Sequence, residues 1–266
     1  MTGREPMNPR GHQYALAGTL PGWTRLERPT PRQRRLLRRS YGGWSPRVYS
    51  RYGVRQWAGV WPGTRIVVKD PFAMLSLPSL AEVTGVRPIL LYRHPGAILA
   101  SYRRMGWRAD ADEIRALPQV AGRRGSHDPA PGGDQESDTD AMAYFWSTLH
   151  ELALHDLESL PAAIVVSHEE LAQAGQPALR ALYDHCDLEW TSQVELALTG
   201  QRVDAATQSP TSRLHDFDRA PHEVAQAWRA RLSEAEIDAL ESATRVVRQQ
   251  LEERRMRLLA DRSDST

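Results

Sequence analysis

Apolar runs alternate with helix-start signals between Thr64 and Trp107, and this stretch gives the chain its clearest pattern. A β-branched run at Ile66–Val68 ends on Lys69, and a second apolar run at Pro88–Tyr92 ends on Arg93. Both runs are too short for helices and have the length of buried strands. The pattern therefore predicts two consecutive strand–helix units.

Each predicted strand is followed by residues that begin and end helices. Asp70-Pro71 supplies an N-cap acceptor and a proline for the first helical position, and Pro78 restarts the helix. Gly85 can end that helix in a left-handed turn. His94-Pro95 opens the second helix, and Gly106 can stop it.

Repeated strand–helix units indicate parallel strands joined by helical crossovers, which is an α/β fold. In such a sheet Lys69 and Arg93 end neighbouring strands at the same edge, beside helix N-termini whose free N–H groups favour anions. The pattern therefore predicts a binding site for a phosphorylated or sulfated ligand.

Further elements follow along the chain. Ala141–Leu157 has apolar residues at helical spacing, Ala162–Ser167 is typical of a buried strand, and Gln176–Cys186 of a helix. Ser233 and Glu236 form a capping-box pattern that begins a charged C-terminal helix reaching Arg257. We expect one domain over residues 1–266.

Composition narrows the class of protein. The single cysteine, Cys186, excludes an internal disulfide and a cysteine metal cluster. No apolar run approaches membrane-spanning length, and residues 1–30 have no signal-peptide pattern, so we expect a cytoplasmic protein with no membrane partner. Neither the oligomeric state nor the acceptor can be deduced from the sequence.

Charge is unevenly spread although the formal net charge is only +1. Residues 1–60 are an irregular basic region with aromatic residues and one helix predicted near Gln33–Arg39, which is a pattern also seen in nucleic-acid binders. Because the rest of the chain cancels this charge, a solvated or acceptor-facing surface is favoured over a nucleic-acid site. Residues 108–140 are a flexible loop insertion, either a substrate-facing lid or a disordered segment.

Lys69 is the only lysine among 34 lysine and arginine residues. The other 33 cationic side chains are arginines, so arginine is used wherever any surface cation suffices. The one lysine stands at the end of a predicted strand. That choice suggests a task for a compact point charge on a single oxygen, for which a guanidinium is too wide. Chance survival of one surface lysine is the alternative.

The segment Lys69-Asp70-Pro71-Phe72 through Ser101 resembles sulfotransferases that use 3′-phosphoadenosine 5′-phosphosulfate (PAPS), especially bacterial and tyrosylprotein sulfotransferases. In that family an Arg at a strand end and a Ser eight residues later bind the 3′-phosphate, as Arg93 and Ser101 are spaced here. The resemblance implies a P-loop-NTPase-like three-layer fold with a parallel sheet. The alternative for Ser101 is a helix serine bonded to its own backbone.

The resemblance extends more loosely to other segments. Glu5-Pro6-Met7-Asn8-Pro9 is similar to the family's EPFNP-like element, which implies Glu5 as the base that takes the acceptor's proton. His168-Glu169-Glu170-Leu171 is similar to its YEDL segment, where we interpret the two glutamates as structural and the histidine as packed or at the surface. Ser212 and Arg213, before a Trp-Arg pair, are implied as weaker nucleotide-binding candidates.

One family element has no counterpart in this sequence. The 5′-phosphosulfate loop, a PRSGTT-like turn after a first strand, should precede the Glu5 element, yet only four residues do. Three explanations are open: a start further upstream, a fragment, or a degenerate homologue. We therefore expect the N-terminal strand and the phosphate loop to be missing from the fold.

The resemblance implies transfer of a sulfuryl group from PAPS to a hydroxyl or amine of a small-molecule or peptide acceptor, with adenosine 3′,5′-bisphosphate as product and no metal. Lys69 and Glu5 would be catalytic, and Arg93, Ser101, Ser212 and Arg213 would bind the nucleotide. Two alternatives remain: a non-catalytic homologue that serves as a binding or assembly module, and a basic nucleic-acid-binding protein. A P-loop kinase is disfavoured because no GxxxxGK[ST] motif occurs.

Overall fold

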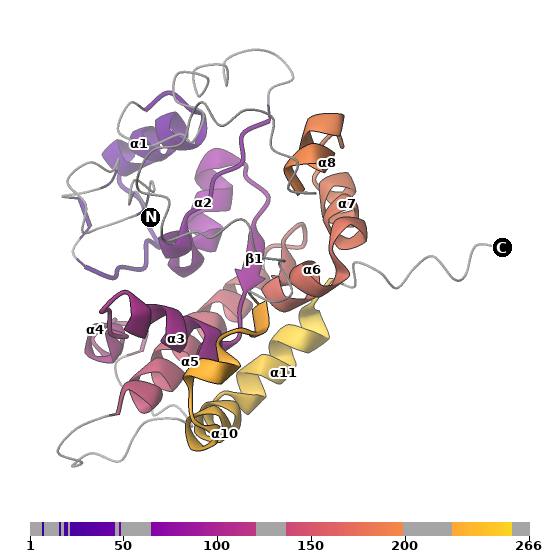
Figure 1. The fold of residues 1–266 in the computed structure, drawn as a ribbon. Helices are drawn as coiled ribbons and strands as arrows, with labels where there is room; N and C mark the ends of the chain where they lie inside the picture. Colours follow the sequence, from indigo (N-terminus) through magenta and orange to yellow (C-terminus); the bar gives the residue numbers. More distant parts are fainter. Residues whose placement is uncertain are drawn as a thin grey trace.

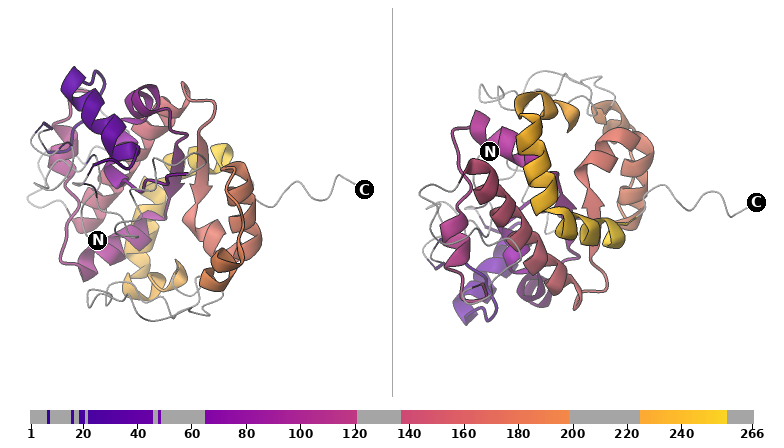
Figure 2. Two further views of the ribbon diagram at one scale, coloured as in Figure 1. Left: turned by 90° about the horizontal axis from the view of Figure 1, so that it is seen from above. Right: turned by 90° about the horizontal axis from the view of Figure 1, so that it is seen from below.

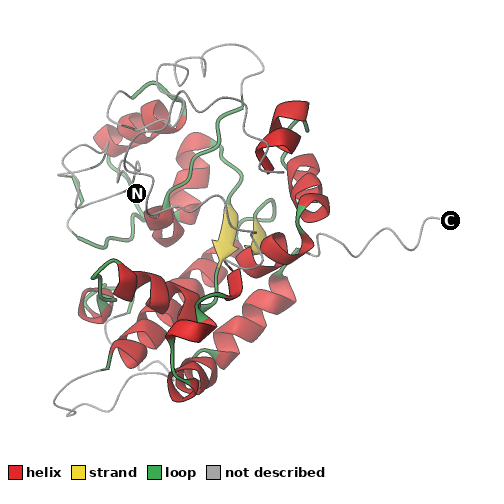
Figure 3. Ribbon diagram, viewed as in Figure 1, coloured by secondary structure: helices red, strands yellow, loops and turns green. Residues whose placement is uncertain are grey.

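In the computed structural model of the chain, the described residues are 7, 16, 19, 20, 22–45, 48, 65–120, 137–198 and 225–256. They form a helix-rich α/β arrangement around a small parallel sheet (Figure 3). In chain order the elements are α1 (Pro31–Tyr41), the 3-10 helix η2 (Pro71–Leu75), α2 (Leu77–Thr84), β1 (Ile89–Tyr92), α3 (Pro95–Arg104), α4 (Ala111–Arg115), α5 (Asp138–Leu157), β2 (Ile164–Ser167), α6 (His168–Ala174), α7 (Gln176–His185), α8 (Ser192–Leu198), the 3-10 helix η4 (Arg229–Arg231), α10 (Glu234–Ala243) and α11 (Arg245–Arg254) (Figure 1).

The sheet consists of β1 and β2, which pair in parallel with Ile89 opposite Ile164 and Tyr92 opposite Ser167. The chain between them passes through α3, α4 and α5, because parallel neighbours need a long crossover. The outer edge of β2 makes one further parallel bridge, to Arg255. The strands predicted at 88–92 and 162–167 are confirmed.

The strand predicted at Ile66–Val68 is wrong. Residues 65–70 have no regular secondary structure, and the side chains of Ile66 and Val67 are 40% and 77% exposed. A short β-branched run gains little from a parallel sheet unless both of its faces are covered. The neighbour of β1 is therefore β2, and the prediction that Lys69 and Arg93 end adjacent strands is wrong as well.

Alternation along the strands decides which side chains enter the core. Leu90 of β1 and Val165 of β2 face the main core, whereas Val166 packs against α7 on the opposite face. On that opposite face Ile89 and Leu91 are 42% and 53% exposed. The sheet is therefore covered on both faces at β2 but on only one face at β1.

Helix α5 runs through the main core. Trp146 at its centre is 1% exposed, and its indole Nε1 donates a hydrogen bond of 3.0 Å to the backbone carbonyl of Arg93. The helices α2, α3, α4, α10 and α11 pack around α5 (Figure 2). The indole bond ties the end of β1 to this central helix, and so fixes the start of α3.

Helix α1 packs on α2 around a second, smaller core that includes Leu37 and Leu80. Thr30 and Gln33 close a reciprocal capping box at its start, with Pro31 in the first position. The helix predicted near 33–39 is therefore confirmed and is slightly longer. The left-handed turn predicted at Gly85 is also present, with φ of 70°.

His150 is buried in α5 and gives the fold a pH dependence. Its ring stacks on Trp146 with centroids 4.1 Å apart, and its Nδ1 donates to the Trp146 carbonyl at 2.7 Å. Burial lowers the pKa of His150 to about 4. Between that pKa and the unfolded value of about 6.5 only the unfolded chain holds the proton, so stability rises with pH across this window and acidification from pH 7 to pH 4 removes about 3 kcal/mol.

We therefore expect the variant His150→Phe to show a shallower loss of unfolding free energy between pH 7 and pH 4 than the parent chain, measured by urea denaturation. His155→Phe is the matched control, because His155 lies on the same helix with its side chain 68% exposed. Parallel pH curves for the parent and His150→Phe would contradict the assignment.

Candidate functional site

Arg93 follows β1 directly and precedes α3, at the carboxyl end of the parallel sheet. Its side chain is half-buried, and the buried Nε has no hydrogen-bond partner. The pKa of Arg93 is lowered, first by burial and then by the charge of Arg104, while Glu169 acts in the opposite direction. A desolvated guanidinium with unused donors is suited to binding an anion bidentately.

Ser101 lies two turns into α3 and is half-exposed. Some helical hydroxyls in the described chain bond back to the preceding turn, as Ser40 does to Leu36 and Thr84 does to Leu80. The Ser101 hydroxyl makes no such bond among the described residues, so the back-bonded alternative is wrong. Its donor and acceptor are both available on the helix that Arg93 precedes.

Arg104 belongs to the same surface and was not singled out from the sequence. It lies one turn beyond Ser101 on α3, is exposed, and lowers the pKa of Arg93 through like-charge repulsion. Two cations close enough to repel, with a free hydroxyl on the intervening helix, form an arrangement that an anion would stabilise. The signal in the sequence was the i,i+3 spacing of Ser101 and Arg104.

The N-terminus of α3 is not open to a ligand in the way predicted. The backbone N–H of Gly96 donates to Nδ1 of His94 at 3.1 Å, and the N–H of His94 donates to Glu169 at 3.0 Å. The indole of Trp228 stacks on the His94 ring with centroids 4.5 Å apart. The prediction of free helix-terminal donors beside Arg93 is therefore wrong, because groups of the chain itself use them.

His94 can accept that hydrogen bond because it is neutral. Burial, followed by the charges of Arg248 and Arg229, lowers the pKa of His94 to about 4. Its other nitrogen, Nε2, lies 3.5 Å from a carboxylate oxygen of Glu241. The sequence identified His94 only as a helix opener, since its partners Trp228 and Glu241 come from distant parts of the chain.

At the end of β2 the surface is acidic. A hollow of about 440 Å³ is lined by Ser167, Glu169, Glu170, Gln173, Ala174, Glu252 and Arg255. Arg255 pairs with Glu170 at 2.6 Å and with Glu252 at 3.0 Å, and Glu169 accepts from the backbone of His94. These contacts confirm the structural interpretation of Glu169 and Glu170. A hollow bordered by three carboxylates repels anions, so this hollow is not suited to an anionic ligand.

His168 begins α6 and is a packed residue, as interpreted from the sequence. Its side chain is half-buried, and its Nδ1 is buried without a hydrogen-bond partner. Burial, followed by the charge of Arg93, lowers the pKa of His168. The imidazole is therefore neutral near pH 7 and adds no charge to the Arg93 surface.

Lys69 is exposed in the irregular segment that precedes η2. Its neighbour Asp70 is the predicted N-cap, with Oδ1 accepting from the N–H of Phe72 at 3.1 Å. The other oxygen, Oδ2, accepts from the backbone N–H of Met7 at 2.7 Å. Met7 is 1% exposed and lies 63 positions earlier in the chain, so the contact joins Met7 to the residue next to the lone lysine.

A chain of aromatic rings connects the Lys69 segment to α3. Phe72 lies 4.5 Å from Trp23 by ring centroids, Trp23 lies 5.7 Å from Phe145 of α5, and Phe145 lies 6.5 Å from Tyr102. Tyr102 adjoins Ser101 on α3. The lysine segment and the Arg93–Ser101 surface thus flank the same stretch of α5.

Three of the predicted site residues, Glu5, Ser212 and Arg213, lie outside the described residues, and so does the part of the loop insertion at 121–136. Within the described ranges, no group of three or more His, Cys, Asp or Glu side chains could hold a metal ion. None of the helices described is both long and apolar enough to cross a membrane. Comparison with family models, curated proteins and solved structures found no match for this chain.

Proposed function

We propose that this protein is a sulfotransferase-like enzyme that transfers a sulfuryl group from PAPS to a hydroxyl or amine acceptor. The observation that carries the proposal is Arg93: a half-buried guanidinium without a direct partner at the end of a parallel strand, with the free hydroxyl of Ser101 on the helix that follows. A 3′-phosphate would satisfy both groups. The P-loop-NTPase-like three-layer architecture is part of the same proposal.

Each site residue has a role in the proposed reaction. Arg93 and Ser101 hold the 3′-phosphate and supply binding energy remote from the reacting sulfur, with Ser212 and Arg213 as further nucleotide contacts. The acceptor oxygen bonds to sulfur as the bond from sulfur to the 5′-phosphate oxygen breaks, and the electron pair stays on that oxygen. Lys69 stabilises the oxygen as its charge develops, and Glu5 takes the acceptor's proton.

The contact between Met7 and Asp70 supports the pairing of Glu5 with Lys69. Glu5 precedes Met7 by two residues, and Lys69 precedes Asp70 by one. A partly buried hydrogen bond of 2.7 Å from the Met7 backbone N–H to the Asp70 carboxylate thus joins a residue near the proposed base in sequence to a residue next to the proposed cation. Sequence separation alone gave no reason for these segments to meet.

A binding module without turnover is the second candidate. The exposure of Lys69, on a segment that does not pair with β1, favours it. Such a module would use Arg93 and Ser101 to bind the nucleotide, and Lys69 would then be an ordinary surface residue. Nucleotide affinity is common to both candidates, whereas the effect of Lys69 on transfer separates them.

Arg93→Ala is expected to weaken binding of adenosine 3′,5′-bisphosphate by about 10- to 100-fold, because it removes charged hydrogen bonds to the 3′-phosphate. Isothermal titration calorimetry with the bisphosphate measures this directly, without any acceptor. Ser101→Ala should produce a smaller loss in the same direction, since one neutral donor is removed.

Arg87→Ala is the matched control, because Arg87 lies before β1, at the opposite end of the strand, and its ion pair with Asp187 at 3.2 Å is exposed. An affinity in Arg93→Ala equal to that of this control would overturn the nucleotide site.

A further inference from the structure

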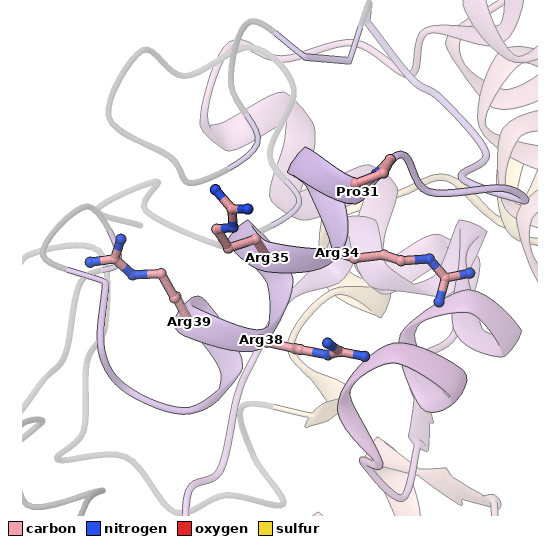
Figure 4. A pocket seen from close by; sticks show the side chains of 5 residues that line it. All are labelled: Pro31, Arg34, Arg35, Arg38 and Arg39. Atoms are coloured by element: carbon pink, nitrogen blue, oxygen red, sulfur yellow. The ribbon is translucent and has the colours of Figure 1, made fainter.

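The outer face of α1 carries a concentration of arginines that the proposed nucleotide site does not use. Arg34 and Arg38 point toward α2, where Arg34 pairs with Glu82 at 2.9 Å and Arg38 Nε donates to the Val83 carbonyl at 3.2 Å (Figure 4). Arg35 and Arg39 point away from this contact (Figure 4). These four α1 arginines thus divide between a packing role and an outward-facing one.

Arg35 and Arg39 are exposed, and neither makes an ion pair with any described residue. Together with Pro31, Arg34 and Arg38 they line a hollow of about 340 Å³. Like charges at i,i+4 destabilise a helix, and α1 has no acidic residue in its first turn to balance its dipole. The helix therefore carries an electrostatic cost that an acidic ligand in the hollow would offset.

The opposite, buried side of α1 lies close to the Lys69 segment. The buried side of α1, including Leu37 and Tyr41, packs against Val68 and Phe72. The charge of Asp70, acting after burial, raises the pKa of Tyr41, so the C-terminal end of α1 adjoins the residue next to Lys69. A ligand on the outer face is separated from that segment by about one helix diameter, roughly 10 Å.

An exposed aromatic residue follows the arginines in the chain. Trp44 is 53% exposed, and its backbone N–H donates to the Arg39 carbonyl at 2.7 Å just beyond the helix end. A flat indole can stack on the apolar face of a sugar ring, and guanidinium groups bind carboxylates bidentately. A nucleic acid, by contrast, is held by a longer run of phosphate contacts than this short helix provides.

We propose that the outer face of α1, formed by Arg35, Arg39 and Trp44, binds an acidic oligosaccharide, with its carboxylates in the arginine hollow and a sugar ring against the indole. A uronic-acid oligosaccharide combines these carboxylates with the hydroxyl groups that sulfuryl transfer requires. Its assignment as the acceptor rests on the proposed function, whereas the binding surface itself does not.

The test uses a hexasaccharide of galacturonic acid and measures its affinity for the full chain by calorimetry, without nucleotide. The salt concentration is 50 mM, at which the Debye length is about 14 Å. The double variant Arg35→Gln/Arg39→Gln is expected to bind at least about tenfold more weakly. The control is Arg231→Gln/Arg245→Gln, which removes the same charge from exposed arginines that also make no ion pair with described residues.

Three results would overturn the proposal: no hexasaccharide binding by the parent chain, equal losses in the two double variants, or tighter binding of a single-stranded DNA dodecamer or a hexaglutamate peptide under the same conditions. Adenosine 3′,5′-bisphosphate affinity, measured on the same variants, should be unchanged. If the parent chain does not bind adenosine 3′,5′-bisphosphate, only the proposed function is refuted. If it does not bind the hexasaccharide, only the binding surface on α1 is refuted.

Discussion

Lys69→Ala is expected to lower the rate of sulfuryl transfer from PAPS by about 10²- to 10³-fold, the usual cost of removing a fixed charge from a developing oxyanion. The affinity for adenosine 3′,5′-bisphosphate should stay nearly unchanged, because Arg93 and Ser101 hold the 3′-phosphate independently. Transfer can be followed with sulfur-labelled PAPS and two acceptor probes, p-nitrophenol and the galacturonate hexasaccharide.

Lys69→Arg distinguishes a specific role from a general need for positive charge. A guanidinium spreads its charge over a wide plane and should not restore the rate, although it keeps the net charge of the chain. Equal loss of transfer and of nucleotide binding in Lys69→Ala would remove the catalytic role. A parent chain that binds the bisphosphate but transfers no sulfuryl group to either probe would favour the binding module.

Arg25→Met is expected to destabilise the protein by about 3–5 kcal/mol, because it leaves a buried carboxylate without its partner. Arg25 pairs with Asp156 at the end of α5, and their side chains are only 11% and 3% exposed. Burial raises the pKa of Asp156, and Arg25 opposes that rise. Urea denaturation near pH 7 measures the loss.

The double variant Arg25→Met/Asp156→Leu should recover most of this stability, because an apolar pair of similar volume needs no desolvation of charge. Arg108→Met is the control: Arg108 pairs with Asp138 at 2.9 Å, but both side chains are well exposed, so its loss should stay below about 1 kcal/mol. A loss in Arg25→Met as small as that of the control would contradict the assigned role of the pair.

Local signals in the sequence predicted most of the helix boundaries. The capping box at Ser233 and the glycine turn at Gly85 depend on residues within one helical turn of each other, and both are present. The charged C-terminal helix, however, breaks at Thr244, whose hydroxyl bonds back to Leu240. Short-range sequence patterns were therefore sufficient to predict where helices begin, but not where the C-terminal helix is interrupted.

Strand pairing and the site depend on distant residues, and there the sequence was a weaker guide. The β-branched run at Ile66–Val68 looks like a strand, yet no described residues cover it on both faces. Asp70 was predicted as a cap only, since nothing local indicates its bond to Met7. The partners of His94 likewise come from beyond residue 160, so the occupied start of α3 could not be predicted from the sequence.

The packing of Trp228 on Gly96 also bears on synthesis of the chain. A side-chain carbon added at Gly96 would lie 2.4 Å from the indole, so this position accepts glycine alone unless the indole moves. The indole is made 132 residues after that glycine, a delay of about 7–26 s at ordinary rates of translation. During that interval the start of α3 in the nascent polypeptide is not covered by the indole of Trp228. Ribosome-associated chaperones would therefore be most needed in this period.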